Sequence, residues 1–160
     1  LFSISEAIEA LNEDFIVHTT SPNFFHDWSW YKSVVNVKNH FNSVMKDAYW
    51  SNVHSFIDWR IVCPSRNESD NRDLSELCGT IRSRVREAAE DENKISAVIE
   101  CCLKLLVSLP KECTSTNSAL TAYIEGMENY MKKGEINPKY FSEFSAWWGR
   151  GMQYISFIKI

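Results

Sequence analysis

Histidines and cysteines are the residues of this chain that could bind a metal or attack a substrate. None of the histidines falls in a His-x-x-x-His or Glu-x-x-His pattern, the spacings that bring two zinc ligands to one face of a helix. His54 and Asp58 are four residues apart and share a face if their segment is helical. That pair suits a local hydrogen bond better than a ligand set, so we expect neither a metal nor another cofactor. The four histidines are His18, His26, His40 and His54.

The cysteines predict buried, reduced thiols rather than a disulfide framework. Their number is odd, two are adjacent in an apolar helical stretch, and no Cys-x-x-Cys pair occurs. Cys63 precedes Pro64 in a polar stretch and is the most exposed candidate nucleophile, but a reactive thiolate needs a histidine partner. This usage, with no apolar run near the roughly 18 residues of a membrane span, predicts a cytoplasmic protein. The cysteines are Cys63, Cys78, Cys101, Cys102 and Cys113.

Nucleotide and nucleic-acid sites are disfavoured by the glycines and the charge. None of the five glycines follows a strand and opens a helix, as a phosphate-binding loop requires. Gly149-Arg150-Gly151 could contact an anion, but a tight bend that lets Trp147 and Trp148 pack is the favoured interpretation. The net charge of −4 disfavours a general nucleic-acid binder. The acidic residues of 87–92 are interpreted as a solvated helix end.

Two aromatic clusters, at residues 24–32 and 141–154, are the best candidates for a binding surface. Neighbouring aromatic side chains in one short segment cannot all face a single core, and Trp and Arg are enriched at interaction hot spots. The rings either fill the ends of a helical bundle or contact another domain or a second copy of the chain. The candidate contact residues are Trp28, Trp30, Tyr31, Lys32, Trp147, Trp148 and Arg150.

The sequence predicts a mainly α-helical fold for the segments that carry the candidate residues. With 160 residues, 44% of them hydrophobic, the chain suits one domain with its own core. Five Gly and four Pro are too few for the many turns of a β-sandwich. Apolar residues recur at steps of three and four, which predicts an irregular bundle of about six helices. The expected helices span residues 4–11, 36–59, 71–90, 94–109, 114–133 and 139–148.

The organisation of these elements can also be predicted. We expect a single domain over 1–160, with residues 63–71 as an exposed linker between an aromatic-rich N-terminal part and a three-helix core. That core should come from residues 71–133, with the helix near 37–59 packed on it. Residues 15–20 and 152–158 are β-prone and could pair to join the chain ends; alternatively, the last segment continues the preceding helix.

Five segments of the chain share a texture of aromatic, apolar and charged residues. They are residues 2–8, 15–22, 54–60, Phe25-His26-Asp27-Trp28-Ser29-Trp30-Tyr31-Lys32 and Trp147-Trp148-Gly149-Arg150-Gly151. Together these segments resemble the helical C-terminal extension of bacterial S-adenosylmethionine-dependent methyltransferases. The glycine-rich cofactor loop and the acidic residue of that fold have no counterpart here. The resemblance therefore implies a catalytic domain upstream of Leu1, and it assigns no cofactor-binding residue to this chain.

These observations predict a non-catalytic accessory or interaction module that acts through its aromatic clusters. Its partner would be another protein domain or a second copy of the chain, not a nucleic acid or a membrane. Two alternatives stay open. The chain could be the C-terminal part of a methyltransferase that contributes to substrate choice or oligomer contacts, or a small helical protein with an apolar ligand pocket.

Overall fold

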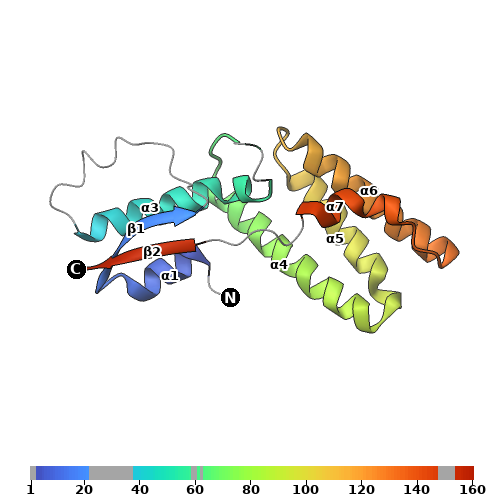
Figure 1. The fold of residues 1–160 in the computed structure, drawn as a ribbon, viewed down its shortest axis with the longest axis horizontal. Helices are drawn as coiled ribbons and strands as arrows, with labels where there is room; N and C mark the ends of the chain where they lie inside the picture. Colours follow the sequence, from blue (N-terminus) through green and yellow to red (C-terminus); the bar gives the residue numbers. More distant parts are fainter. Residues whose placement is uncertain (1–2, 22–37, 59–60, 62, 148–153) are drawn as a thin grey trace.

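The chain forms six α-helices and a two-stranded antiparallel sheet in the residues described by the computed structural model, which are 3–21, 38–58, 61, 63–147 and 154–160 (Figure 1). The predicted mainly α fold with a minor β pairing is confirmed. The α-helices are α1 (Ile4–Leu11), α3 (Lys38–Asn52), α4 (Glu68–Glu90), α5 (Ile95–Ser108), α6 (Thr114–Lys133) and α7 (Ser142–Trp147). The strands are β1 (Phe15–Ser21) and β2 (Tyr154–Lys159), and short 3-10 helices are η1 (Val53–Phe56), η2 (Glu92–Lys94) and η3 (Pro138–Tyr140).

Local sequence signals set the ends of several helices. Ser3 and Glu6 form a capping box on α1, in which the Ser3 hydroxyl accepts from the Glu6 N–H at 3.2 Å and the Glu6 carboxylate accepts from the Ser3 N–H at 2.6 Å. Gly134 ends α6 in the left-handed region at a φ of 72°, a conformation that costs a glycine little. Pro138 begins η3, where its missing N–H leaves no bond unmade.

The predicted pairing of the chain ends is confirmed by the antiparallel register of β1 and β2. Phe15 pairs with Lys159 and Thr20 with Ile155, and an irregularity in the register lies between Val17 and Thr19. Both strands lie beside α1 and α3 at one end of the molecule (Figure 1). The sheet and these two helices share a small core, which consists of Ile4, Ile8, Val17, Met45 and Tyr49.

Helix α3 packs on α4 of the three-helix core, as predicted, and also on α1 and β1. Its buried residues Met45 and Tyr49 belong to the core shared with α1 and the sheet. The Lys46 ammonium forms an ion pair with Glu9, and the Trp50 Nε1–H donates to the Ser5 hydroxyl at 3.1 Å. These contacts fix α3 on α1, while its C-terminal end reaches α4.

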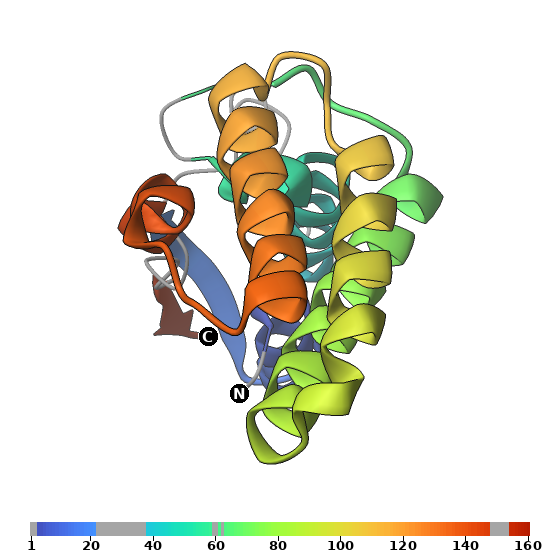
Figure 2. The same cartoon turned by 90° about the vertical axis from the view of Figure 1, so that its right-hand side faces the viewer.

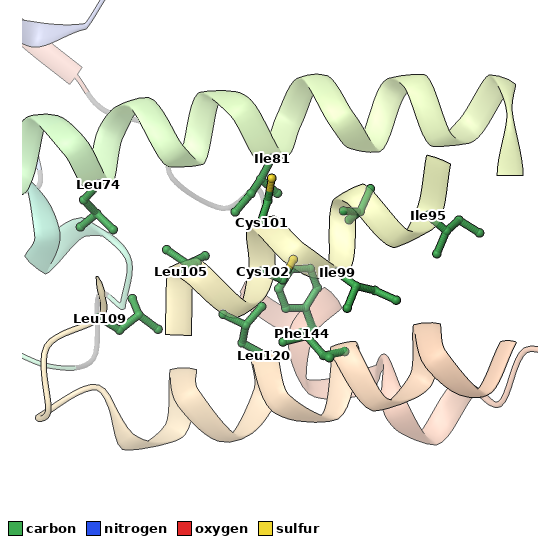
Figure 3. Close-up of a cluster of buried hydrophobic side chains, with 12 residues drawn as sticks. Leu74, Ile81, Ile95, Ile99, Cys101, Cys102, Leu105, Leu109, Leu120 and Phe144 are labelled. Carbon is green, nitrogen blue, oxygen red and sulfur yellow. The ribbon is translucent and has the colours of Figure 1, made fainter. Parts of the chain in front are cut away.

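The larger core lies between α4, α5 and α6, with α7 packed on α6 (Figure 2). Ile81 of α4 and Leu120 of α6 point toward α5 from opposite sides, and Cys101 and Cys102 are buried between them, as predicted (Figure 3). Burial raises the pKa of Cys102 to about 11, so its thiol stays protonated near neutral pH. The buried members of this core are Leu74, Ile81, Ile95, Val98, Ile99, Cys101, Cys102, Leu105, Leu109, Leu120, Ile124 and Phe144.

The exposed segment between the two cores is shorter than residues 63–71. Cys63 is only 3% exposed and Asn71 is fully buried, so the predicted exposure of Cys63 is wrong. Cys63 contacts Cys113. Asn71 contacts the end of α3, because α4 already begins at Glu68 and Asn71 lies on its buried face. Within residues 63–71, the exposed side chains are those of residues 64, 65 and 67–70.

Candidate functional site

An apolar pocket of about 380 Å³ opens in the helical part of the molecule. It lies where the C-terminal half of α4, the start of α5 and the middle of α6 come together, and the segment that follows α6 closes one side. Glu92 is the single ionisable acid or base among its lining residues apart from two tyrosines. The lining residues are Val85, Ala88, Ala89, Glu92, Ile95, Val98, Tyr123, Met127, Tyr130, Ile136 and Phe141.

Aromatic contacts hold the segment after α6 in place beside this pocket. The Tyr123 ring stacks on Phe144 at a centroid distance of 4.3 Å and meets Phe141 edge-on at 5.6 Å. Gly126, one turn further along α6, lets Tyr140 and Phe141 lie close to the helix backbone. A Cβ added at Gly126 would lie 2.6 Å from the Cβ of Tyr140. Burial raises the pKa of Tyr123 to about 12, so its hydroxyl remains neutral.

The rim of the pocket is acidic and partly apolar. The Tyr130 hydroxyl donates to the Glu92 carboxylate at 2.8 Å, and this hydrogen bond raises the pKa of Tyr130. Val85 is 38% exposed and Ile136 is 68% exposed, so apolar surface continues outward from the pocket. Glu87 lies in the same region but is paired with Arg84 at 2.9 Å. Glu92 is therefore the one carboxylate among the lining residues of the pocket.

A second polar cluster is buried where the two cores meet. His54 of η1 is fully buried; its Nε2–H donates to the Pro64 carbonyl at 2.8 Å, and its Nδ1 accepts from the Asn71 amide at 3.1 Å. The same Asn71 amide donates to the Trp50 carbonyl at 2.6 Å. Both ring nitrogens thus have partners in the neutral form of His54. This cluster joins the end of α3 to α4, and the hydrogen bonds of His54 and Asn71 connect parts of the protein to one another.

Asp58 lies beyond this cluster and supports the start of α6. Its carboxylate, 2% exposed, accepts from the Thr116 hydroxyl at 2.8 Å in the first turn of that helix. Cys113, at the N-cap position of α6, makes no side-chain capping bond. A carboxylate near a helix N-terminus interacts favourably with the exposed N–H groups and the helix dipole. His54 and Asp58 have different partners, and the helical segment η1 ends at Phe56, before Asp58.

We expect the stability of the protein to fall as the pH drops below about 6.5. Burial, more than any other effect, lowers the pKa of His54 in the folded chain, while His54 of the unfolded chain titrates normally. The unfolded state therefore binds more protons in that range, and unfolding becomes easier by up to about 1.4 kcal/mol per pH unit. Urea unfolding of the wild type and of His54→Gln between pH 7.5 and 5.5 measures the slope, with the exposed His18→Gln as control. An unchanged slope in His54→Gln would contradict the assignment.

The binding residues expected from the sequence fall largely outside the described residues. Trp28, Trp30, Tyr31 and Lys32 are among residues 22–37, and Trp148 and Arg150 are among residues 148–153. Trp147 is the last residue of α7, but its side chain is not described. Their role and the question of whether the two aromatic clusters meet stay open predictions. Within the second cluster, Phe144 is buried and stacked in the core.

Apart from Phe141, which belongs to the second aromatic cluster, the residues of the pocket are not predicted as site residues from the sequence. Tyr123, Met127 and Tyr130 lie on the predicted apolar stripe of α6, where they are indistinguishable from core residues. The available signal was the pair of tyrosines seven residues apart, since a tyrosine combines an apolar ring with a hydroxyl that needs a partner. Glu92 belongs to the acidic run that was interpreted as a solvated helix end.

Among the described residues, no three or more His, Cys, Asp or Glu side chains are grouped so that they could hold a metal ion. No helix in the described part of the chain has the length and apolar character needed to cross a membrane. Comparisons with protein-family models, with curated proteins and with solved structures find no match. The resemblance to methyltransferase extensions therefore receives no support from these comparisons.

Proposed function

We propose that this chain is a non-catalytic interaction module whose pocket receives an apolar side chain of another protein. The observation that carries the proposal is the apolar pocket between α4, α5 and α6, with Val85 and Ile136 exposed around it. Apolar surface that continues from a pocket to its rim suits a protein partner, which covers the surroundings as well as the cavity. A buried apolar anchor surrounded by weaker contacts is the usual energetic pattern of such interfaces.

Charge at the rim indicates the chemistry of the partner. Glu92 lines the pocket, its carboxylate accepts from the Tyr130 hydroxyl, and the whole chain has a net charge of −4. A positive group next to the apolar anchor would gain from this field and associate faster. The proposed partner is therefore a segment that carries an apolar side chain with a Lys or Arg close to it.

Selection of a displayed random-peptide library on the purified chain tests this proposal. We expect enriched peptides to share an apolar residue with a neighbouring Lys or Arg. Ala89→Trp should weaken their binding by more than about tenfold, because Ala89 is an exposed residue of the pocket wall and the indole would occupy the mouth. Ala10→Trp, at an exposed position of α1, places the same side chain away from the pocket and should leave binding unchanged.

The charge part of the proposal has its own pair of variants. Glu92→Gln should weaken binding and reduce its dependence on salt, whereas Glu90→Gln at the exposed end of α4 should do so much less. Peptides that bind Ala89→Trp as well as the wild type would contradict the pocket as the contact site. A library that yields no common apolar position would contradict a peptide partner altogether.

A small apolar ligand is the second candidate, and the pocket volume favours it. A volume of about 380 Å³ lies within the range of roughly 300–1,000 Å³ that is typical of ligand sites. The neutral fluorescent probe N-phenyl-1-naphthylamine distinguishes the two cases. Binding of this probe that Ala89→Trp abolishes, combined with a failed peptide selection, would favour the ligand. Association of two copies through the Trp clusters stays a separate prediction, which the mass of the chain in solution tests.

A further inference from the structure

Two buried thiols from distant parts of the chain touch each other at the junction of the two cores. The Sγ atoms of Cys63 and Cys113 are 3.7 Å apart, and the residues are 50 positions apart in sequence. Cys63 is 3% exposed and Cys113 is 1% exposed. Cys63 follows η1 and precedes α4, whereas Cys113 is the N-cap residue of α6. The contact therefore joins the segment between the cores to the helical part.

We propose that Cys63 and Cys113 form a disulfide when the protein meets a low-molecular-weight disulfide oxidant such as oxidised glutathione. One cysteine thiolate attacks a glutathione sulfur, forms a mixed disulfide and releases one glutathione thiolate. The second cysteine thiolate attacks the protein sulfur of that mixed disulfide and releases the other glutathione. The two thiols lose two protons and two electrons, and oxidised glutathione is reduced to two glutathione thiols.

The distance and the surroundings favour this pair over the other cysteines. A disulfide needs a sulfur–sulfur distance of about 2.05 Å, and the two Sγ atoms are already in contact at 3.7 Å. Cys101 and Cys102 are neighbours on α5, inside the larger core, and Cys78 is on the adjoining helix α4. Those three sit in helices, where the backbone restricts how sulfurs can approach. The Cys63 segment, by contrast, is not part of a helix.

The surroundings of Cys113 make its thiolate harder to form. Burial, the hydrogen bond with Cys63 and the nearby carboxylates of Asp58 and Glu112 raise the pKa of Cys113 well above its usual range. The Cys113 thiol must therefore lose its proton before it can attack a disulfide sulfur. Both sulfurs are buried, which makes the first step depend on local opening of the segment around Cys63.

The disulfide would tie the start of α6 to the segment that leads into α4. Arg66 already links the same segment to α5, since its guanidinium donates to the Ser108 carbonyl at 3.0 Å. Closing a loop of this length restricts the unfolded chain, and a rise of the melting temperature on the order of 10 °C is expected. Oxidation would thus make the junction between the two cores more rigid without a change in fold.

Mass spectrometry of the whole chain after incubation with oxidised glutathione tests the proposal. We expect the loss of two hydrogen masses, a cross-linked peptide pair that contains Cys63 and Cys113, a higher melting temperature, and reversal by dithiothreitol. Cys113→Ser should instead retain one glutathione on Cys63, while Cys78→Ser should still form the cross-link. Because the peptide map uses the wild-type chain, it remains decisive if a variant fails to fold. A stable glutathione adduct on the wild type, a different pairing, or unmodified thiols would each overturn the proposal.

Discussion

Removal of residues 154–160 is expected to unfold the N-terminal part of the molecule, with a loss of more than about 5 kcal/mol. Strand β2 supplies the pairing partners of β1, and its Ile155 and Phe157 pack on the small core. The Phe157 ring meets Phe15 edge-on at 6.5 Å. Without β2, Val17 would lose its cover and β1 its ladder hydrogen bonds. A loss of that size is comparable to the total stability of a typical domain.

Hydrogen exchange followed by mass spectrometry measures this effect by region. In the truncated chain, the amides of α1 and α3 should lose protection, since both helices depend on the core beneath the sheet. The variant Ile158→Ala is the control, because Ile158 is on β2 but 56% exposed, and it should leave both helices protected. An unchanged melting temperature of the truncated chain would show that β2 contributes nothing to the fold.

The variant Asn71→Ala should destabilise the protein by about 2–4 kcal/mol. The Asn71 amide donates to both the Trp50 carbonyl and His54 Nδ1, and alanine would leave these two acceptors buried without that donor. An unsatisfied buried polar group costs roughly 1–3 kcal/mol, and two are created here. The effect is large because Asn71 is fully buried and connects α4 to the end of α3.

Urea unfolding of Asn71→Ala and of Asn67→Ala provides a matched comparison. Asn67 is exposed at the N-cap position of α4, and its side chain makes no capping hydrogen bond. Its replacement should therefore change the unfolding free energy by about 0.5 kcal/mol or less. A similar small change in Asn71→Ala would mean that the buried cluster adds little to the joining of the two cores.

The helices and the joining of the chain ends could be predicted because their signals are local. The stripe through Leu74 and Ile81 specifies an amphipathic helix from spacing alone, and the β-prone character of residues 15–20 and 152–158 suggested a pairing. The packing of α3 on α1 and the sheet could not be predicted in the same way. The spacing of its apolar residues indicates that one face is buried, but it does not indicate which elements cover that face.

The pocket could not be predicted because it depends on how helices meet. Tyr123 and Tyr130 become pocket residues only because residues of α4 and α5, such as Val85 and Ile95, line the same space. In the sequence, Gly126 is a residue that slightly lowers the stability of a helix. The structure explains its presence, because Tyr140 approaches the backbone of α6 too closely for a side chain at this position. The same holds for Cys63, whose polar neighbours suggested exposure although Cys113 covers it.

Nuclear magnetic resonance of methyl-labelled methionine tests the central claim that the pocket binds a partner. Met127 lines the pocket, whereas Met45 is buried in the separate core under the sheet. On titration with a selected peptide that carries an apolar residue beside a Lys or Arg, the Met127 methyl resonance should shift and the Met45 resonance should stay in place. Saturable binding of that peptide with an unmoved Met127 resonance would contradict the pocket as the binding site.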